Sequence, residues 1–142
     1  MTSIDANILL YSYSEASLHH AAAKAFLESL SPRDDVALSE VYLHLRNPAV
    51  LDAPLSPAEA VAVIQSYRQH PRWRVLGFPP RSRDLHTALW KAAAAPDFAR
   101  RRIYDLRIAL CLQAFGVTDF ATANVKHFED AGFARVWNPL SS

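Results

Sequence analysis

The sequence predicts a three-layer α/β domain, in which a parallel sheet of four to five strands lies between two layers of helices. Short apolar segments of strand character alternate with longer segments whose apolar residues recur at helical spacing. Successive strands lie too far apart in the chain for hairpins, which favours parallel pairing. With 142 residues, the chain is long enough for one core and too short for two, so we expect residues 1–142 to form a single domain.

The first half of the chain opens on an unusually short strand. The expected elements are a strand at 2–4, helices at 5–13 and 17–30, a strand at 36–38 and a helix from 40 to 45. Pro32 ends the second helix, and Pro48 ends the third. Ser39 is the predicted N-cap of the helix that carries Glu40.

The second half contains clearer start and stop signals. We expect helices at 57–69, 82–94 and 104–115, and strands at 73–76, 119–122 and 133–137. Ser56 and Glu59 have the spacing of a capping box, and Pro57 suits the first helical position. Gly116 follows the last apolar residue of the 104–115 helix, where it favours a C-terminal cap.

Composition excludes several classes of protein. The net charge is +1, half of the residues are apolar and a fifth are charged, as in ordinary globular proteins. No apolar run reaches the roughly 18–20 residues of a membrane span, and the N-terminus lacks the basic cluster of a secretory signal. A single cysteine, Cys111, excludes an internal disulfide and fits a reducing cytoplasm, where we expect the protein, away from membranes.

Four polar residues mark the predicted strand-to-helix transitions and helix starts. Asp5 follows the first strand, Glu40 follows the second, Asp105 begins a helix, and Asn124 follows the strand at 119–122. In a doubly wound parallel sheet such transitions lie at one edge, so these side chains are expected to converge. The position of the acids has a second explanation, because helix N-termini favour negative charge.

Two interpretations of these residues therefore stay open. Carboxylates gathered in one pocket repel each other unless a cation compensates, and Mg²⁺ or Mn²⁺ suits hard oxygen ligands. Such an ion would indicate a metal-dependent phosphodiesterase. Alternatively, Asp5 and Asp105 are helix caps, Glu40 is a first-turn charge, and no metal binds.

A basic cluster precedes Asp105 and could contact the backbone of a nucleic acid. It contains three consecutive arginines, with a fourth just beyond the acid: Arg100, Arg101, Arg102 and Arg107. The cluster predicts phosphate contacts if it borders an acidic pocket, and otherwise a solvated face. His127 has a similar pair of interpretations, as a structural residue or as one that approaches a bound nucleic acid.

Ordered segments along most of the chain resemble those of PIN-domain ribonucleases, and closely those of VapC toxins from bacterial VapBC toxin–antitoxin modules. The matching segments are DANILLY at 5–11, SEV at 39–41, IYDLRIA at 103–109, GVT at 116–118, TANVKHF at 122–128 and VWNP at 136–139. No single segment is decisive, whereas the ordered set is fairly specific. The resemblance implies a PIN-like fold.

The resemblance also implies an activity and a partner. Members are endoribonucleases that cleave single-stranded regions of RNA, such as tRNA, rRNA or mRNA, with Mg²⁺ or Mn²⁺. VapC toxins are typically homodimers that a VapB antitoxin silences. We therefore expect an RNA substrate, a VapB-like antitoxin and a homodimer. The apolar residues of the first three helices, among them Leu9, Leu10, Phe26, Val41 and Leu45, could line an antitoxin groove or simply pack internally.

Carried over residue by residue, Asp5, Glu40 and Asp105 match the metal-binding acids of the family. Asn7 matches the residue that orients the first acid, and Thr122 matches the small hydroxyl residue beside the fourth catalytic position.

Asn124 departs from the family pattern, because many members have a fourth Asp there. An amide oxygen can coordinate a metal or its water but adds no charge and cannot act as a base. The departure predicts activity that depends on metal concentration. It also leaves open a degenerate PIN domain that only binds RNA or protein. A phosphatase of the haloacid dehalogenase type is disfavoured, because it would need a second Asp at position 7, which is Asn.

Overall fold

The computed structural model describes residues 1–30, 35–36, 45–75, 79 and 81–141. Within this part of the chain, five strands form one parallel sheet in the order β3-β2-β1-β4-β5. They are β1 (Thr2–Ile4), β2 (Asp35–Val36), β3 (Arg74–Val75), β4 (Asp119–Ala121) and β5 (Arg135–Trp137). The predicted parallel sheet is confirmed, and the N-terminal strand lies at its centre.

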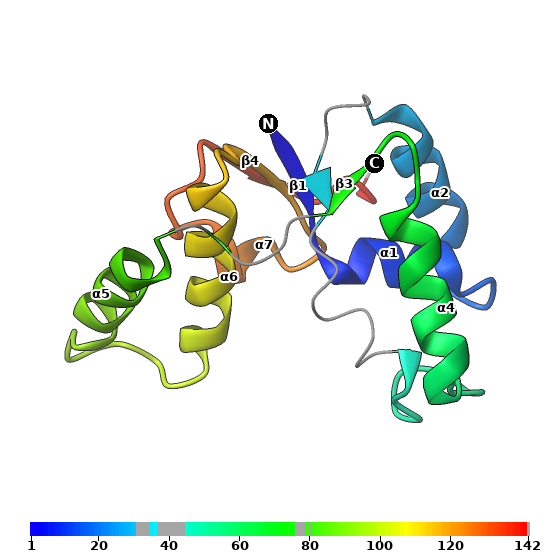
Figure 1. The fold of residues 1–142 in the computed structure, drawn as a ribbon, viewed down its shortest axis with the longest axis horizontal. Coiled ribbons are helices and arrows are strands. Elements are labelled where there is room, and N and C mark those ends of the chain that lie inside the picture. Colours follow the sequence, from blue (N-terminus) through cyan, green and yellow to red (C-terminus); the bar gives the residue numbers. More distant parts are fainter. Residues whose placement is uncertain (31–34, 37–44, 76–78, 80, 142) are drawn as a thin grey trace.

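Helices flank the sheet on both sides (Figure 1). They are α1 (Ala6–Tyr13), α2 (His20–Ser29), α4 (Pro57–Arg68), α5 (Ser82–Ala93), α6 (Arg102–Ala114) and α7 (Val125–Phe128). In Figure 1, β1 lies between a group made of α1, α2 and α4 and a group made of α5, α6 and α7. The architecture is therefore the predicted α/β/α sandwich.

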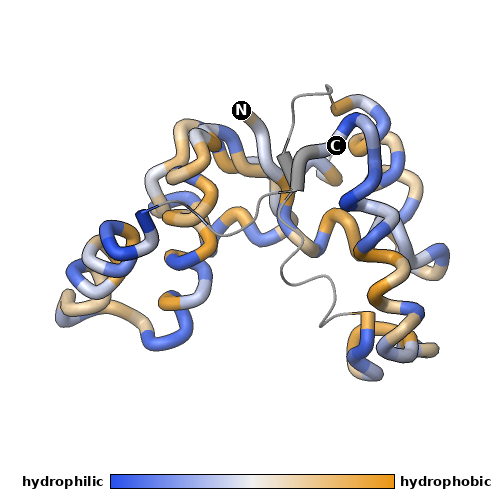
Figure 2. Tube along the Cα trace, viewed as in Figure 1, coloured by the Kyte–Doolittle hydropathy of each residue, from blue (hydrophilic) through white to orange (hydrophobic). Residues whose placement is uncertain are grey.

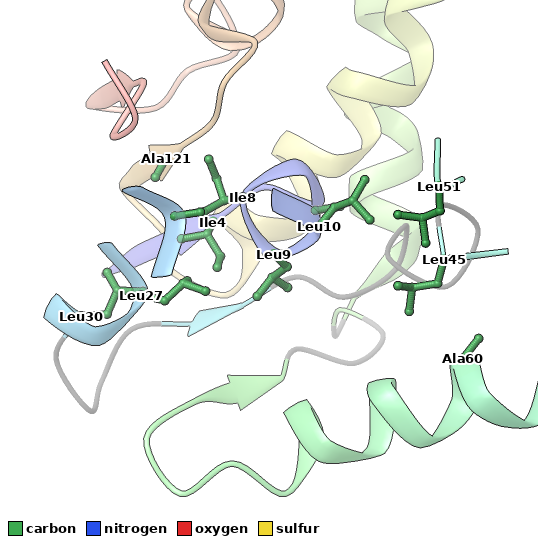
Figure 3. Packing of buried hydrophobic residues seen from close by; sticks show 12 residues of the cluster. Ile4, Ile8, Leu9, Leu10, Leu27, Leu30, Leu45, Leu51, Ala60 and Ala121 are labelled. Carbon is green, nitrogen blue, oxygen red and sulfur yellow. The ribbon is translucent and has the colours of Figure 1, made fainter. Parts of the chain in front are cut away.

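Two separate hydrophobic clusters show that both faces of the sheet are covered. Successive residues of a strand point to opposite faces, and Ala121 of β4 belongs to one cluster whereas Phe120 belongs to the other. The larger cluster joins Ile4 to α1, α2 and the 45–51 segment (Figure 3). The smaller packs α6 and α7 against β4. Hydrophobic residues accordingly occur in both groups of helices in Figure 2.

Local signals at two helix ends match the sequence prediction. The Ser56 hydroxyl accepts from the Glu59 N–H at 3.2 Å, and the Glu59 carboxylate accepts from the Ser56 N–H at 3.1 Å, which completes the capping box of α4. After α6, Gly116 has φ +85°, a left-handed conformation that L side chains rarely adopt. The Val117 N–H bonds to Leu112 O at 3.1 Å, and α6 ends in a Schellman motif.

Other details differ from the sequence prediction, or concern residues that the structure does not describe. Helix α6 begins two residues early, at Arg102, and the four-residue helix α7 was not predicted. Trp90 lies on α5 with 59% of its surface exposed. Cys111 is half-buried, and this burial raises the pKa of its thiol. The predicted helix at 40–45 lies, except for Leu45, outside the described residues.

The apolar residues proposed for an antitoxin groove pack largely inside the protein. Leu9, Leu10 and Leu45 are buried in the larger cluster, and Phe26 packs against it with its ring edge toward Trp137. Val41 lies outside the described residues. For the four residues that the structure describes, internal packing is the correct alternative.

Candidate active site at the carboxyl edge of the sheet

The candidate site lies where the neighbouring strands β1 and β4 end. Between these two strands the direction in which successive strands are added across the sheet reverses. The chain leaves β1 for β2 on one side and returns through β4 on the other. Ile4 pairs with Ala121, and the Asp5 N–H donates to Ala121 O at 2.9 Å. Asp5 and Thr122 therefore emerge side by side at a topological switch point, which is where open α/β sheets bind ligands.

The carboxylate of Asp5 receives two side-chain hydrogen bonds, one from a residue that follows β4 and one from the first turn of α1. The Thr122 hydroxyl donates to Asp5 Oδ2 at 2.6 Å, and the Asn7 amide donates to the same oxygen at 3.0 Å. Asp5 occupies the N-cap position of α1, yet its side chain makes no capping hydrogen bond. Capping alone therefore does not account for the position of this carboxylate, which the bonds to Thr122 and Asn7 hold at the sheet edge.

Thr122 links the acid to the turn that carries Asn124. Its side chain is fully buried, and its hydroxyl accepts the Asn124 N–H at 3.0 Å. A hydroxyl has one proton to donate, and here that proton goes to Asp5. The Ala123 N–H approaches Asn7 Oδ1 at 3.4 Å from the same turn. The two residues predicted to support the site thus connect the β1 and β4 ends.

Burial raises the pKa of Asp5 above its usual value, and the nearby charge of Asp105 acts in the same direction. The hydrogen bond from Thr122 and the backbone N–H groups of Ala6 and Asn7 oppose this shift. The site therefore places an ionisable carboxyl where its negative charge is poorly solvated and would be stabilised by a cation.

Asp105 and Asn124 reach the same cavity as Asp5, although both are far from Asp5 in the sequence. The cavity has a volume of about 240 Å³, and its walls include Asp5, Asn7, Asp105, Asn124 and His127. Asp105 lies in the first turn of α6, and Asn124 is the N-cap residue of α7. The predicted convergence of these three catalytic candidates is thus found in the structure.

The oxygen donors present fit a hard divalent ion. Asp5 and Asp105 offer carboxylates, and Asn124 offers an amide carbonyl. Glu40, the remaining predicted metal ligand, lies outside the described residues. Within the described ranges alone, no cluster of three His, Cys, Asp or Glu residues is positioned to hold a metal. The visible donor set is therefore two acids and one amide.

His127 is the site residue whose position the sequence left undecided. Its Nδ1 lies 3.4 Å from Asp105 Oδ2, an ion pair whenever the imidazole is protonated. Helix α7 creates this contact, because His127 follows the N-cap Asn124 by three residues and both line the cavity. The three-residue spacing between Asn124 and His127 was visible in the sequence. It indicates that both side chains lie on one side of the turn only when a helix at 125–128 is known.

The arginine cluster does not behave as one unit. All four side chains, those of Arg100, Arg101, Arg102 and Arg107, are exposed. Arg102 precedes Asp105 by three residues and lies on the same side of α6, with its guanidinium 5.9 Å from the Phe98 ring. Arg107 follows Asp105 by two residues, about 200° around the helix, and points away from the cavity side. Arg102, and not Arg107, therefore shares the Asp105 side of α6, and none of these four arginines is among the residues that line the cavity.

Comparisons with known proteins agree with this geometry. The chain is 45% identical over 147 aligned residues to Ribonuclease VapC24 of Mycobacterium tuberculosis, and the alignment covers all of this chain and 99% of the relative. Among solved structures it resembles FitAcB from Neisseria gonorrhoeae, with a TM-score of 0.66, 19% identity and full coverage of both chains. It also resembles VapC20 of Mycobacterium tuberculosis, a Sarcin-Ricin loop cleaving toxin.

The VapC20 match has a TM-score of 0.60 and 17% identity, and it covers 84% of this chain and 87% of that one. No protein-family model matches the chain. The two structures establish the fold, and the full-length identity to VapC24 establishes the family. The chain belongs to the VapC family of PIN-domain ribonucleases.

Proposed function

We propose that this protein is a Mg²⁺- or Mn²⁺-dependent endoribonuclease, the toxin of a VapBC-type module. The observation that carries the proposal is the convergence of Asp5, Asp105 and Asn124 on one cavity at the switch point of the sheet. Full-length identity to a VapC ribonuclease supports the choice of RNA as the substrate. The expected targets are single-stranded regions of tRNA, rRNA or mRNA.

Asp5, Asp105 and Glu40 would hold the ion, and Asn124 would contribute a neutral oxygen. When bound, the ion lowers the pKa of water and offsets charge on the leaving oxygen of a phosphodiester. Thr122 and Asn7 keep Asp5 Oδ2 in one orientation, so that the carboxylate needs no rearrangement to receive a cation. The exposed arginines at 100–102 would bind phosphates of the RNA next to the scissile bond and so place that bond at the cavity.

The partners follow from family membership and stay proposals for this chain. A VapB-like antitoxin would silence the nuclease, the protein would form a homodimer, and it would act in the cytoplasm. No helix within the described ranges is both long and apolar enough to cross a bilayer.

Asn124 favours one alternative, a degenerate PIN domain that binds RNA or protein without cutting it. Its amide supplies an oxygen where many relatives have a charged ligand, so the affinity for a second ion should be lower. The two functions differ in whether RNA is cleaved at saturating metal.

The test compares purified Asp5→Ala with the wild type and with Glu28→Ala, a variant of an exposed acid on α2. Antitoxin-free wild type should cut single-stranded RNA at millimolar Mn²⁺ and lose this activity in excess EDTA. Asp5→Ala should keep the circular dichroism spectrum of the fold and lose cleavage, whereas Glu28→Ala keeps both. Cleavage that persists in Asp5→Ala contradicts the mechanism. A wild type that binds RNA but cuts none at any Mn²⁺ concentration supports the degenerate domain.

A further inference from the structure

A second and larger cavity adjoins the acidic one. It has a volume of about 760 Å³ and lies between the C-terminal end of α1, the loop that leads to α2, and the segment at 50–53. Leu10, Tyr11 and Val50 line both cavities, so the second, here called the side groove, is continuous with the site at Asp5. A polymer held with one phosphodiester at the acids can therefore place a neighbouring unit in this groove.

The walls of the side groove are held in place by their own hydrogen bonds. On the α1 side, the Ser17 N–H bonds to Ser14 O at 3.0 Å, and the His19 N–H bonds to the Ser17 hydroxyl at 3.1 Å. On the other side, Leu51 is buried in the larger cluster near Leu10 (Figure 3). A groove with such walls is formed before a ligand arrives, which lowers the entropic cost of binding.

Two aromatic rings line the side groove. Tyr11 is half-buried and packs against the His19 ring at a centroid distance of 5.1 Å. Tyr13 is 37% exposed, which leaves part of its ring available to a ligand. Aromatic faces of this kind stack with unpaired bases of single-stranded RNA.

Charge indicates which part of RNA the side groove would take. Its described lining residues include two exposed acids, Glu15 and Asp52, and no lysine or arginine. Carboxylates repel phosphates, so the groove does not suit the RNA backbone. They accept hydrogen bonds from base edges that carry donors, and guanine offers two, N1–H and the N2 amino group, on its Watson–Crick edge.

We propose that the side groove binds the base next to the cleaved phosphodiester and prefers guanine. The base would stack on Tyr13, and Glu15 or Asp52 would accept its N1 and N2 protons. The inference rests on the proposed ribonuclease function, and it adds a sequence preference that the acidic cavity alone does not provide.

The test uses a pool of single-stranded RNA oligonucleotides with randomised bases, cut by the full-length protein at millimolar Mn²⁺. Sequencing the cut ends should show guanine enriched about tenfold at one position beside the cut, the discrimination expected of a paired hydrogen-bond contact. Replacing that guanine by inosine, which lacks the N2 amino group, should reduce kcat/KM several-fold. A flat distribution of bases beside the cut overturns the proposal.

Variants then assign the preference to the side groove. The double variant Glu15→Gln with Asp52→Asn should reduce the guanine-to-inosine ratio to about one, whereas Glu28→Gln, outside the groove, should keep it. Tyr13→Ala should lower kcat/KM for every base by about tenfold, and Tyr13→Phe should preserve it. A guanine preference that survives in the double variant overturns the assignment.

The outcomes separate this inference from the function on which it rests. If the wild type cuts no RNA, the proposed function fails and the inference fails with it. If the wild type cuts RNA without regard to neighbouring bases, only the inference fails. If the double variant weakens binding of the antitoxin while the guanine-to-inosine ratio stays unchanged, the side groove holds protein and the proposal is wrong.

Discussion

The Thr122 hydroxyl donates a 2.6 Å hydrogen bond to Asp5 Oδ2, although 117 residues separate the two in the chain. Thr122→Val keeps the shape of the side chain and removes the donor. Because the bond reaches a charged group, its loss should cost about 1.5–3 kcal/mol of stability. It should also raise the pKa of Asp5 further, because the hydrogen bond is the largest influence that lowers it.

Urea unfolding and an NMR titration of the Asp5 carboxyl measure the two effects of Thr122→Val. Thr122→Ser retains the hydroxyl and should stay near the wild type in the Asp5 pKa. Equal pKa values in the Val and Ser variants would show that the hydroxyl does not act on Asp5.

The raised pKa of Asp5 gives a stability effect with a defined sign. The folded protein binds a proton at Asp5 more tightly than the unfolded chain does, so this stabilisation is complete below the unfolded pKa and is lost as pH rises through the folded pKa. At neutral pH, without metal, the ionised carboxylate therefore lowers stability. Asp5→Asn should be more stable than the wild type at pH 7 in EDTA.

The advantage of Asp5→Asn should shrink as pH falls toward the usual Asp pKa of about 3.9. Free energies of unfolding from urea titrations at several pH values check this trend. Excess Mn²⁺ should reverse the order at pH 7, because an ion at 100 times its Kd stabilises the wild type by about 2.7 kcal/mol. A wild type that Mn²⁺ does not stabilise contradicts a metal role for Asp5.

Substitutions at Asn124 should change the metal concentration that RNA cleavage requires. Asn124→Asp adds a charge to the cavity wall and should lower the Mn²⁺ concentration for half-maximal cleavage about five- to tenfold, since each nearby unit charge contributes 1 kcal/mol or more. Asn124→Ala removes the amide oxygen and should raise that concentration. Metal titrations of cleavage rate compare the three proteins. If only Asn124→Asp cuts RNA, the natural chain is a degenerate domain.

The two sides of α6 should differ in their effect on RNA binding. Arg102→Glu, on the Asp105 side, should weaken binding across all RNA sequences and reduce the dependence of log K on log salt by about one unit. Arg107→Glu makes the same change in charge on the other side of the helix. It should have the smaller effect in fluorescence-anisotropy titrations. Equal losses in the two variants would point to a diffuse charge effect rather than a contact surface.

Alanine substitutions at two glycines with positive φ should distinguish the stability cost of backbone strain from that of a steric contact. A Cβ at Gly116 meets nothing within 4 Å, so Gly116→Ala should cost only the left-handed conformation, about 1–2 kcal/mol. A Cβ at Gly132 (φ +93°) would also lie 3.2 Å from the Gln113 amide nitrogen, so Gly132→Ala should cost more. Thermal unfolding measures both changes. A smaller cost at Gly132 would mean that Gln113 moves aside freely.

The sequence predicted those features that depend on local chemistry. The capping box at Ser56, the glycine cap after α6 and the placement of Asp5 after β1 all follow from residue types at short spacing. The convergence of Asp5 and Asn124 also followed, because parallel strands share a carboxyl edge, and Asp105 was expected there as a residue at a helix start. These features need no knowledge of tertiary packing.

Other features depend on packing that one sequence does not show. Helix α7 has only four residues, too few for a periodic pattern, so the approach of His127 to Asp105 could not be predicted. Helical spacing at Trp90 indicates a helix, but not that Leu85 and Leu89 would be its buried residues. The side groove depends on a turn and a loop brought together by the fold.

The pairing of β1 with β4 has a consequence for the order in which the protein is made. Strand β1, at the centre of the sheet, is made long before its neighbour β4, which begins only at Asp119. A nascent chain that ends within α6 carries Asp5 without the hydroxyl of Thr122 and without Asn124. The candidate site is therefore incomplete for most of translation, and it can form only after β4 and the turn that carries Asn124 have been made.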